Sequence, residues 1–86
     1  MHTVIFTRRA VKSIRKIPRT DQRKIKKAIL ELEENPFIPG TIKLLNYPYA
    51  QYRRGVGDYR ILFDLEEDKK LLIIADIRRR TSTTYQ

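Results

Sequence analysis

Apolar residues recur along the chain with two different periods, and each period predicts a different kind of element. Between residues 20 and 34 they recur at every third or fourth position: Ile25, Ala28, Ile29 and Leu32. This spacing places them on one face of an α-helix and is the clearest helical signal in the chain. From Tyr59 to Leu65 apolar and polar side chains largely alternate instead, as they do in a strand with one buried face.

Capping and helix-breaking residues mark the element boundaries near the N-terminus. The segment TVIF, residues 3–6, predicts a short strand. Thr7 then stands where an N-cap would open a helix over residues 8–17. Pro18 ends that helix, because proline has no amide hydrogen to donate to the preceding turn.

The second helix has its own start and stop signals. Either Thr20 or Asp21 can cap its N-terminus, and the segment ENPFIPG, residues 34–40, ends it, because a residue before proline is pushed out of the α region. Residues 41–50 then predict an ordered, partly packed loop in which two tyrosines flank a proline.

Three strands are expected in the second half of the chain. Residues 51–56 and 59–67, separated by Gly57-Asp58, predict a β-hairpin. After a charged turn, the segment LLIIADI, residues 71–77, is apolar on both faces and predicts a central strand. The order β-α-α-β-β-β indicates one α+β domain over residues 1–86: a small, twisted, mainly antiparallel sheet with a two-helix hairpin packed on one face.

Composition changes this picture mainly through charge. Nineteen Lys and Arg against ten Asp and Glu give a net charge of +9, which favours a polyanionic partner, with nucleic acid first and a merely solubilising basic surface as the alternative. The absence of cysteine excludes a disulfide framework and a thiolate metal site. We find no signal peptide, no membrane-spanning run and no Gly-rich phosphate loop. We therefore expect a cytoplasmic protein that contacts no membrane and uses no metal or other cofactor.

Arginines gather where the predicted strands meet. Arg60 projects from the strand face opposite its apolar residues, and the two-residue period puts Arg53 on the same side. The run Arg78–Arg80 follows the central strand directly. Together these residues predict a basic cleft on the side of the sheet away from the helices, although scattered arginines on a wet face would look the same. A guanidinium group suits phosphate, because it stays charged and donates two parallel hydrogen bonds.

A general base for RNA cleavage is hard to find in this composition. His2 is the only histidine and is expected to be a surface residue near the terminus, far in sequence from the arginines. Arginine cannot act as a base, because it does not deprotonate in proteins. Tyr85 is the remaining candidate, since nearby cations favour a phenolate; a frayed terminal residue is the alternative.

The stretch from Lys43 to Tyr85, above all YRRGVGDYRILF at residues 52–63, resembles the second half of the RelE toxins within the RelE/ParE superfamily. The resemblance implies the toxin of a toxin–antitoxin pair, an endoribonuclease that enters the ribosomal A site and cuts messenger RNA with the RNA's own 2′-hydroxyl as nucleophile. It further implies that Arg60 and Arg79 contact the scissile phosphate and that Tyr85 activates the 2′-hydroxyl or stacks on a base. The arginines expected to bind RNA around this centre are Arg53, Arg54, Arg78 and Arg80.

Departures from the family pattern leave alternatives open. Gln51 stands where some relatives carry a lysine, and Ile77-Arg78 replaces a glycine followed by a basic residue, so the cleft arginine is Arg78, Arg79 or Arg80. A ParE-like inhibitor of DNA gyrase and an inactive, basic RNA-binding relative remain the competing interpretations. The expected partners are a RelB-like, acidic antitoxin, the ribosome and messenger RNA.

Overall fold

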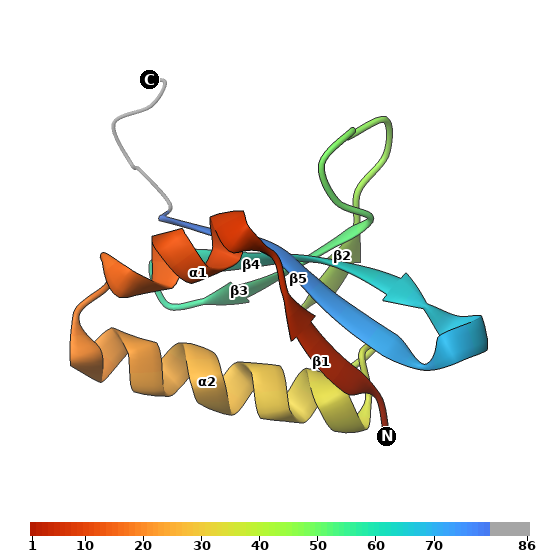
Figure 1. The fold of residues 1–86 in the computed structure, drawn as a ribbon, viewed down its shortest axis with the longest axis horizontal. Helices are drawn as coiled ribbons and strands as arrows, with labels where there is room; N and C mark the ends of the chain where they lie inside the picture. Colours follow the sequence, from red (N-terminus) through yellow and green to blue (C-terminus); the bar gives the residue numbers. More distant parts are fainter. Residues whose placement is uncertain (80–86) are drawn as a thin grey trace.

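A five-stranded mixed sheet and two helices make up the fold in the computed structural model, which describes residues 1–79 (Figure 1). The sheet has the strand order β1-β5-β4-β3-β2, in which β1 runs parallel to β5 and every other neighbouring pair is antiparallel. The elements follow one another along the chain as β1 (Thr3–Phe6), α1 (Arg8–Arg15), α2 (Arg19–Glu34), β2 (Thr41–Lys43), β3 (Tyr52–Val56), β4 (Tyr59–Glu66), the 3₁₀ turn η1 (Glu67–Lys69) and β5 (Leu71–Arg79). The predicted α+β class and mainly antiparallel sheet are confirmed.

The helix boundaries follow the capping signals only in part. Thr7 caps α1 as expected, since its hydroxyl oxygen accepts a hydrogen bond from the Ala10 amide at 3.1 Å. The caps expected for α2 are wrong, because that helix begins at Arg19 with Pro18 at its N-cap position. The Gln22 side chain instead joins the two helices by donating to the carbonyl oxygens of Ile14 and Ile17 at 2.9 and 2.8 Å.

The segment expected to be one continuous loop contains a short strand. Residues 41–43 form β2, which pairs with β3 at the edge of the sheet, so that only residues 44–51 connect the two strands. The strand is three residues long, and Ile42 is 45% exposed, which explains why no apolar alternation announces it. Gly57, with a φ of 58°, forms the expected turn between β3 and β4.

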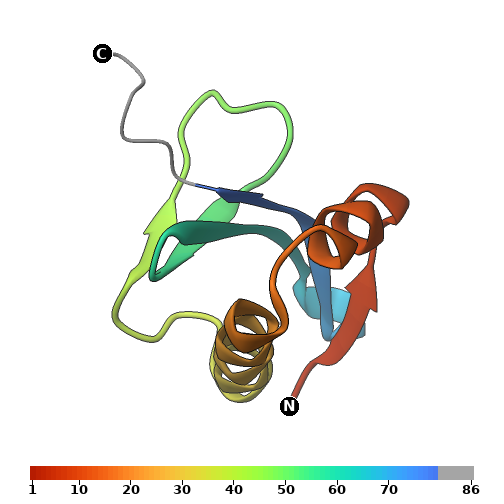
Figure 2. The same cartoon turned by 90° about the vertical axis from the view of Figure 1, so that its left-hand side faces the viewer.

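The core lies between α2 and one face of the sheet. Fully buried side chains from both meet there: Ile25, Leu32, Ile61, Phe63, Leu72 and Ile74. α2 covers this face (Figure 2), as the periodicity of its apolar residues predicts. Within residues 1–79, neither helix has the length and apolar content that a membrane crossing requires.

α1 takes over the edge of β5 at the point where β1 ends. β1 pairs with β5 only as far as Ile74, and the register between β4 and β5 shifts at the next residue, Ala75, which has no partner on β4. At this bulge the Thr7 amide donates to the Ile74 carbonyl oxygen at 3.1 Å, and the Thr7 hydroxyl donates to that of Ala75 at 2.7 Å. Figure 2 shows α1 beside β5 at this edge of the sheet.

Candidate functional site

Three arginines share the sheet face opposite α2. Arg60 on β4 lies directly across from Arg78 on β5, and Arg53 on β3 lies across from Leu62, two residues from Arg60. Directly opposed residues in an antiparallel pair project to the same face. We call this surface the arginine face, defined by Arg53, Arg60 and Arg78. Neither Arg53 nor Arg60 forms a salt bridge with any acidic residue between positions 1 and 79.

Arg79 does not join the arginine face. It pairs with Tyr59, which projects toward the helices, where its hydroxyl lies 3.2 Å from Asp21 Oδ2. Burial raises the pKa of Tyr59, its hydrogen bond to Asp21 and the negative charge of that carboxylate raise it further, and the charge of Arg79 partly opposes them. The resemblance implies that Arg79 contacts the scissile phosphate, but the register places Arg78, and not Arg79, on the arginine face.

Arg54, expected to bind RNA, also lies on the helix side of the sheet. Its side chain is 19% exposed and forms a salt bridge with Glu31 on α2 at 3.2 Å. It also donates to the carbonyl oxygen of Pro39 in the segment after α2. Gly40 makes this possible, because a Cβ there would overlap the Arg54 guanidinium and the backbone has a φ of 102°. Arg54 thus joins α2 to the sheet, which contradicts its place in an RNA-binding surface.

Asp76 positions Arg78, and the sequence reasoning did not single it out. Its side chain is 11% exposed and accepts from the Ser13 hydroxyl at 2.6 Å, the Ile77 amide at 2.8 Å and Arg78 Nε at 3.3 Å. The carboxylate therefore connects α1 to β5 and orients the guanidinium. A signal was present, since Asp76 is the only charged residue in an otherwise apolar strand segment, residues 71–77.

The candidate bases fall outside the described arginine face. His2 is buried, which corrects its expected surface position, and it pairs with Glu67 at 2.9 Å beside the turn before β5. The arginine face lies at the other end of that strand, about 25 Å away at 3.3 Å per residue. The raised pKa of Tyr59 keeps its phenol protonated, so it does not serve as a base at neutral pH. Tyr85 and Arg80 lie outside the described residues.

The arrangement suits an anionic ligand. Two guanidinium groups in register across β4 and β5 can each donate to phosphate oxygens. Gly55 lies opposite Arg60 and leaves the space beside it open, since a Cβ there would meet no atom within 4 Å. Among residues 1–79, no group of His, Cys, Asp and Glu is placed to hold a metal ion.

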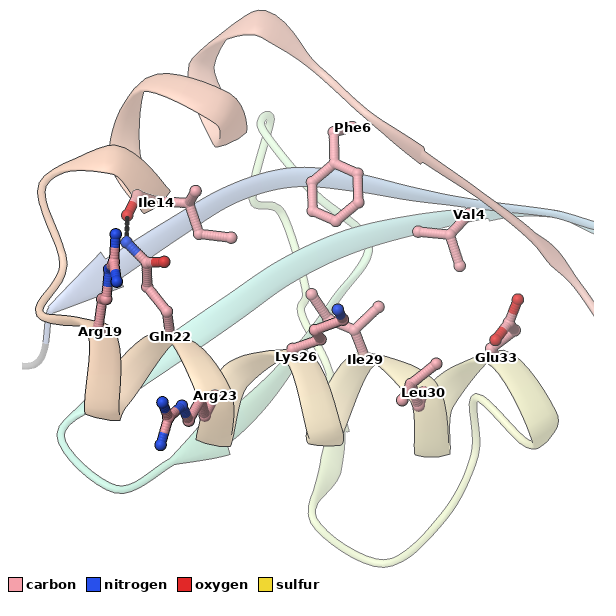
Figure 3. Close-up of a pocket in the computed structure, with 10 residues that line it drawn as sticks. All are labelled: Val4, Phe6, Ile14, Arg19, Gln22, Arg23, Lys26, Ile29, Leu30 and Glu33. Carbon is pink, nitrogen blue, oxygen red and sulfur yellow. Dashed lines mark hydrogen bonds between the residues drawn. The ribbon is translucent and has the colours of Figure 1, made fainter.

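An apolar groove of about 460 Å³ opens between β1 and α2 (Figure 3). Val4, Phe6 and Ile29 contribute apolar walls, and Leu30 on α2 is 52% exposed at its margin. Basic side chains of α2 also line it: Arg19, Arg23 and Lys26. The groove is therefore an apolar surface with a predominantly basic border, and it lies on a different part of the molecule from the arginine face.

Comparisons with known proteins place this fold. No curated protein sequence matches the chain. Among solved structures, the isolated Escherichia coli RelE toxin superposes with a TM-score of 0.82 at 23% identity, over 98% of this chain and 89% of that one. A chain of the toxin–antitoxin complex RelBE2 from Mycobacterium tuberculosis superposes with a TM-score of 0.81 at 20% identity, over 92% of this chain and 98% of that one. A chain of the Pyrococcus horikoshii RelE–RelB complex superposes with a TM-score of 0.78 at 24% identity, over 94% of this chain and 97% of that one.

A sequence model of one family matches almost the whole chain. It describes the ParE toxin of the type II toxin–antitoxin system parDE, and the match runs from residue 4 to residue 83. The solved structures add the RelE fold to this sequence match. The chain therefore belongs to the ParE toxin family, within the RelE/ParE superfamily of type II toxin–antitoxin systems.

Proposed function

We propose that this toxin is a ribosome-dependent endoribonuclease that cuts messenger RNA in the A site and acts in the cytoplasm. The observation that supports this proposal is the register of Arg60 and Arg78, which lie directly opposite each other on the face away from α2. Arg53 extends the same face along β3. Within residues 1–79 neither Arg53 nor Arg60 has an acidic partner, and such an array of guanidinium groups fits the phosphate backbone of RNA.

In the proposed reaction the RNA 2′-hydroxyl attacks the adjacent phosphorus. A bond forms between the 2′-oxygen and phosphorus, the bond from phosphorus to the 5′-oxygen breaks, and the products carry a 2′,3′-cyclic phosphate and a 5′-hydroxyl. Negative charge increases on the phosphate during attack, and Arg60 and Arg78 stabilise it there. Tyr85, carried over from the family resemblance, is proposed to accept the 2′-hydroxyl proton as a phenolate, and the leaving 5′-oxygen takes a proton from water to give the 5′-hydroxyl.

We expect dependence on the ribosome because the chain offers few side chains that can act as a general acid or base. The single histidine pairs with Glu67 away from the arginine face. A ribosome that holds the message with the 2′-hydroxyl aligned for attack on the phosphate supplies this orientation in place of the protein. Orientation alone can lower a barrier by about 7–11 kcal/mol. We therefore expect cutting on programmed ribosomes and little cutting of free, unstructured RNA.

Purified protein incubated with programmed ribosomes and an end-labelled message tests the proposal. New 5′ ends at the A-site codon are expected with the wild type and are lost with Arg60→Ala. Lys43→Ala, which removes a basic residue on the neighbouring edge strand β2, is the matched control and retains cutting. Intact message on ribosomes, with a toxin that still arrests growth, contradicts the endoribonuclease proposal.

Gyrase inhibition is the second candidate, because the matching family model describes a ParE toxin. A plasmid supercoiling assay with the same preparation separates the two functions. Loss of supercoiling with intact messages supports the gyrase inhibitor. RNA binding without either effect supports the third possibility, an inactive RNA-binding relative.

We also propose that a RelB-like, acidic antitoxin fills the groove between β1 and α2 with an amphipathic helix. RelE-type toxins have been crystallised in complexes with RelB from several organisms, which supports an antitoxin partner. The apolar walls suit the apolar face of such a helix, and Arg19, Arg23 and Lys26 suit acidic residues beside it.

Co-expression with the product of an adjacent short reading frame tests this docking site. Leu30→Asp places a negative charge at the margin of the apolar groove, where it repels the proposed acidic helix, and is expected to abolish co-purification. Leu45→Asp, at a residue 78% exposed on the loop after β2, is the matched control and retains the complex. Retention of the complex by both variants excludes the groove as the docking site.

A further inference from the structure

The loop between β2 and β3, residues 44–51, projects on the side of the sheet opposite α2 (Figures 1 and 2). Its base is closed by a hydrogen bond from the Leu44 amide to the Gln51 carbonyl oxygen at 2.8 Å. Gln51 is in turn fixed to β4, because its amide donates to Asp64 Oδ1 at 2.8 Å and its side-chain oxygen accepts from the Leu65 amide at 3.0 Å. The loop is therefore anchored to the strand that carries Arg60.

Two tyrosines of this loop lie beside the arginine face. The rings of Tyr47 and Tyr49 meet edge to face, with 5.6 Å between centroids and 75° between planes. The Arg78 guanidinium carbon lies 6.0 Å from both ring centroids, and that of Arg9 on α1 lies 5.9 Å from the Tyr49 centroid. These distances are within the range of cation–π attraction, so α1 and β5 both position the rings.

A hollow of about 280 Å³ lies between these groups. Its lining includes Tyr49, the basic residues Arg9 and Arg78, and the acidic residues Asp64 and Asp76. The volume is just below the range of about 300–1,000 Å³ that holds drug-sized ligands. It can therefore accept one part of a nucleotide and leave the remainder of a chain outside.

The exposure of Tyr49 is not explained by packing within residues 1–79. The residue is 58% exposed, although aromatic side chains contribute most to stability when they are buried. Arg78 keeps its terminal amino groups for other partners, because Asp76 engages its Nε. An accessible ring next to an oriented guanidinium is the combination that single-stranded RNA uses, with the base stacked on the ring and the phosphate on the cation.

We propose that Tyr49, supported edge-on by Tyr47, is a stacking platform for a base of the RNA whose phosphate lies at Arg60 and Arg78. The inference rests on the proposed function in one respect, that the ligand of the arginine face is RNA. It adds a contact to the base itself, so that part of the affinity comes from a π-face and not from charge. Such a contact tolerates any base but requires that a base be present.

Binding of a seven-nucleotide RNA with 2′-O-methyl groups, which blocks the attacking hydroxyl, tests the platform without cleavage. Fluorescence anisotropy at about 150 mM salt gives Kd for this RNA and for a series in which each nucleotide in turn is abasic. For the wild type we expect one position at which base removal raises Kd by about 5- to 100-fold. Tyr49→Ala is expected to show a similar rise with the complete RNA and no further rise on base removal.

Two further variants separate stacking from loop structure. Tyr49→Phe keeps the ring and is expected to bind within about twofold of the wild type. Leu45→Ala truncates another exposed side chain of the same loop and is expected to change nothing. The proposal is overturned if the wild type binds no RNA, if Tyr49→Ala binds as the wild type does, or if the abasic penalty persists in that variant.

Cleavage on ribosomes by the wild type is measured separately, so that the two proposals can fail independently. If removal of one base raises Kd as expected but the protein cuts no message, the platform stands and the nuclease function is excluded. If the protein cuts messages but base removal does not raise Kd in a way that depends on Tyr49, the nuclease function stands and the platform is excluded.

Discussion

Arg78 and Arg79 are adjacent and exposed on the same strand, yet they are expected to differ greatly in their effect on RNA cutting. Arg78 lies opposite Arg60, whereas Arg79 lies opposite Tyr59 on the helix side. Removing one donor aimed at developing charge typically lowers kcat by about 10²- to 10³-fold. The Arg78 side chain is 45% exposed, and its charge is partly neutralised by the salt bridge to Asp76. We therefore expect a loss in kcat at the lower end of that range for Arg78→Ala, about 100-fold.

For Arg79→Ala we expect a loss below about threefold, because only the screened long-range field of its charge reaches the other face at physiological salt. Single-turnover cleavage on programmed ribosomes measures both rates. Urea unfolding is the control: Arg79→Ala should stay within about 0.5 kcal/mol of the wild type, and Arg78→Ala, which removes the salt bridge to Asp76, within about 1 kcal/mol. A 100-fold loss with Arg79→Ala and none with Arg78→Ala would refute the assignment of the cleft from the register of β4 and β5.

Two further predictions concern stability. Asp76→Asn keeps Oδ1, which accepts from the Ser13 hydroxyl and the Ile77 amide, but replaces Oδ2 with an NH₂ group that cannot accept from Arg78 Nε, so we expect a loss of about 1–3 kcal/mol in urea unfolding. An unchanged midpoint would contradict it, with the exposed Asp68→Asn as control. The raised pKa of Tyr59 means that the folded protein keeps this proton more tightly, so its stabilisation is present below the ordinary pKa of 10.0 and is lost as the pH rises through the folded value. Unfolding at pH 8 and pH 11 should show this alkaline loss in the wild type and a smaller one in Tyr59→Phe, and equal losses would contradict the shift.

Elements with a strong repeating pattern were predictable from the sequence, and those set by distant contacts were not. The second helix and the β3–β4 hairpin follow from apolar periodicity and the turn at Gly57. β2 was missed, because three residues with an exposed Ile42 carry no period. The position of Arg54 depends on Gly40, fourteen residues earlier, whose missing side chain makes room for the guanidinium. The two-residue period separates Arg54 from Arg53 by face, but no local pattern shows the contacts with Glu31 and Pro39 that hold Arg54 against α2.

The clearest limit of local patterns is the choice between Arg78 and Arg79. Strict alternation along β5 from the buried Ile74 would direct Arg78 toward the helices and Arg79 toward the opposite face. The bulge at Ala75 inserts one unpaired residue and reverses this order for the rest of the strand.

Contacts from elsewhere in the chain hold the bulge. Thr7 caps α1 and at the same time donates its amide and hydroxyl to β5 at Ile74 and Ala75, so the start of the helix holds the strand at the irregular step. β1 ends at this point, and α1 replaces it as the neighbour of β5. The same replacement brings Ser13 to Asp76, which orients Arg78. The bulge sets which arginine faces the proposed RNA, and a threonine about seventy residues earlier is hydrogen-bonded to the strand at that bulge.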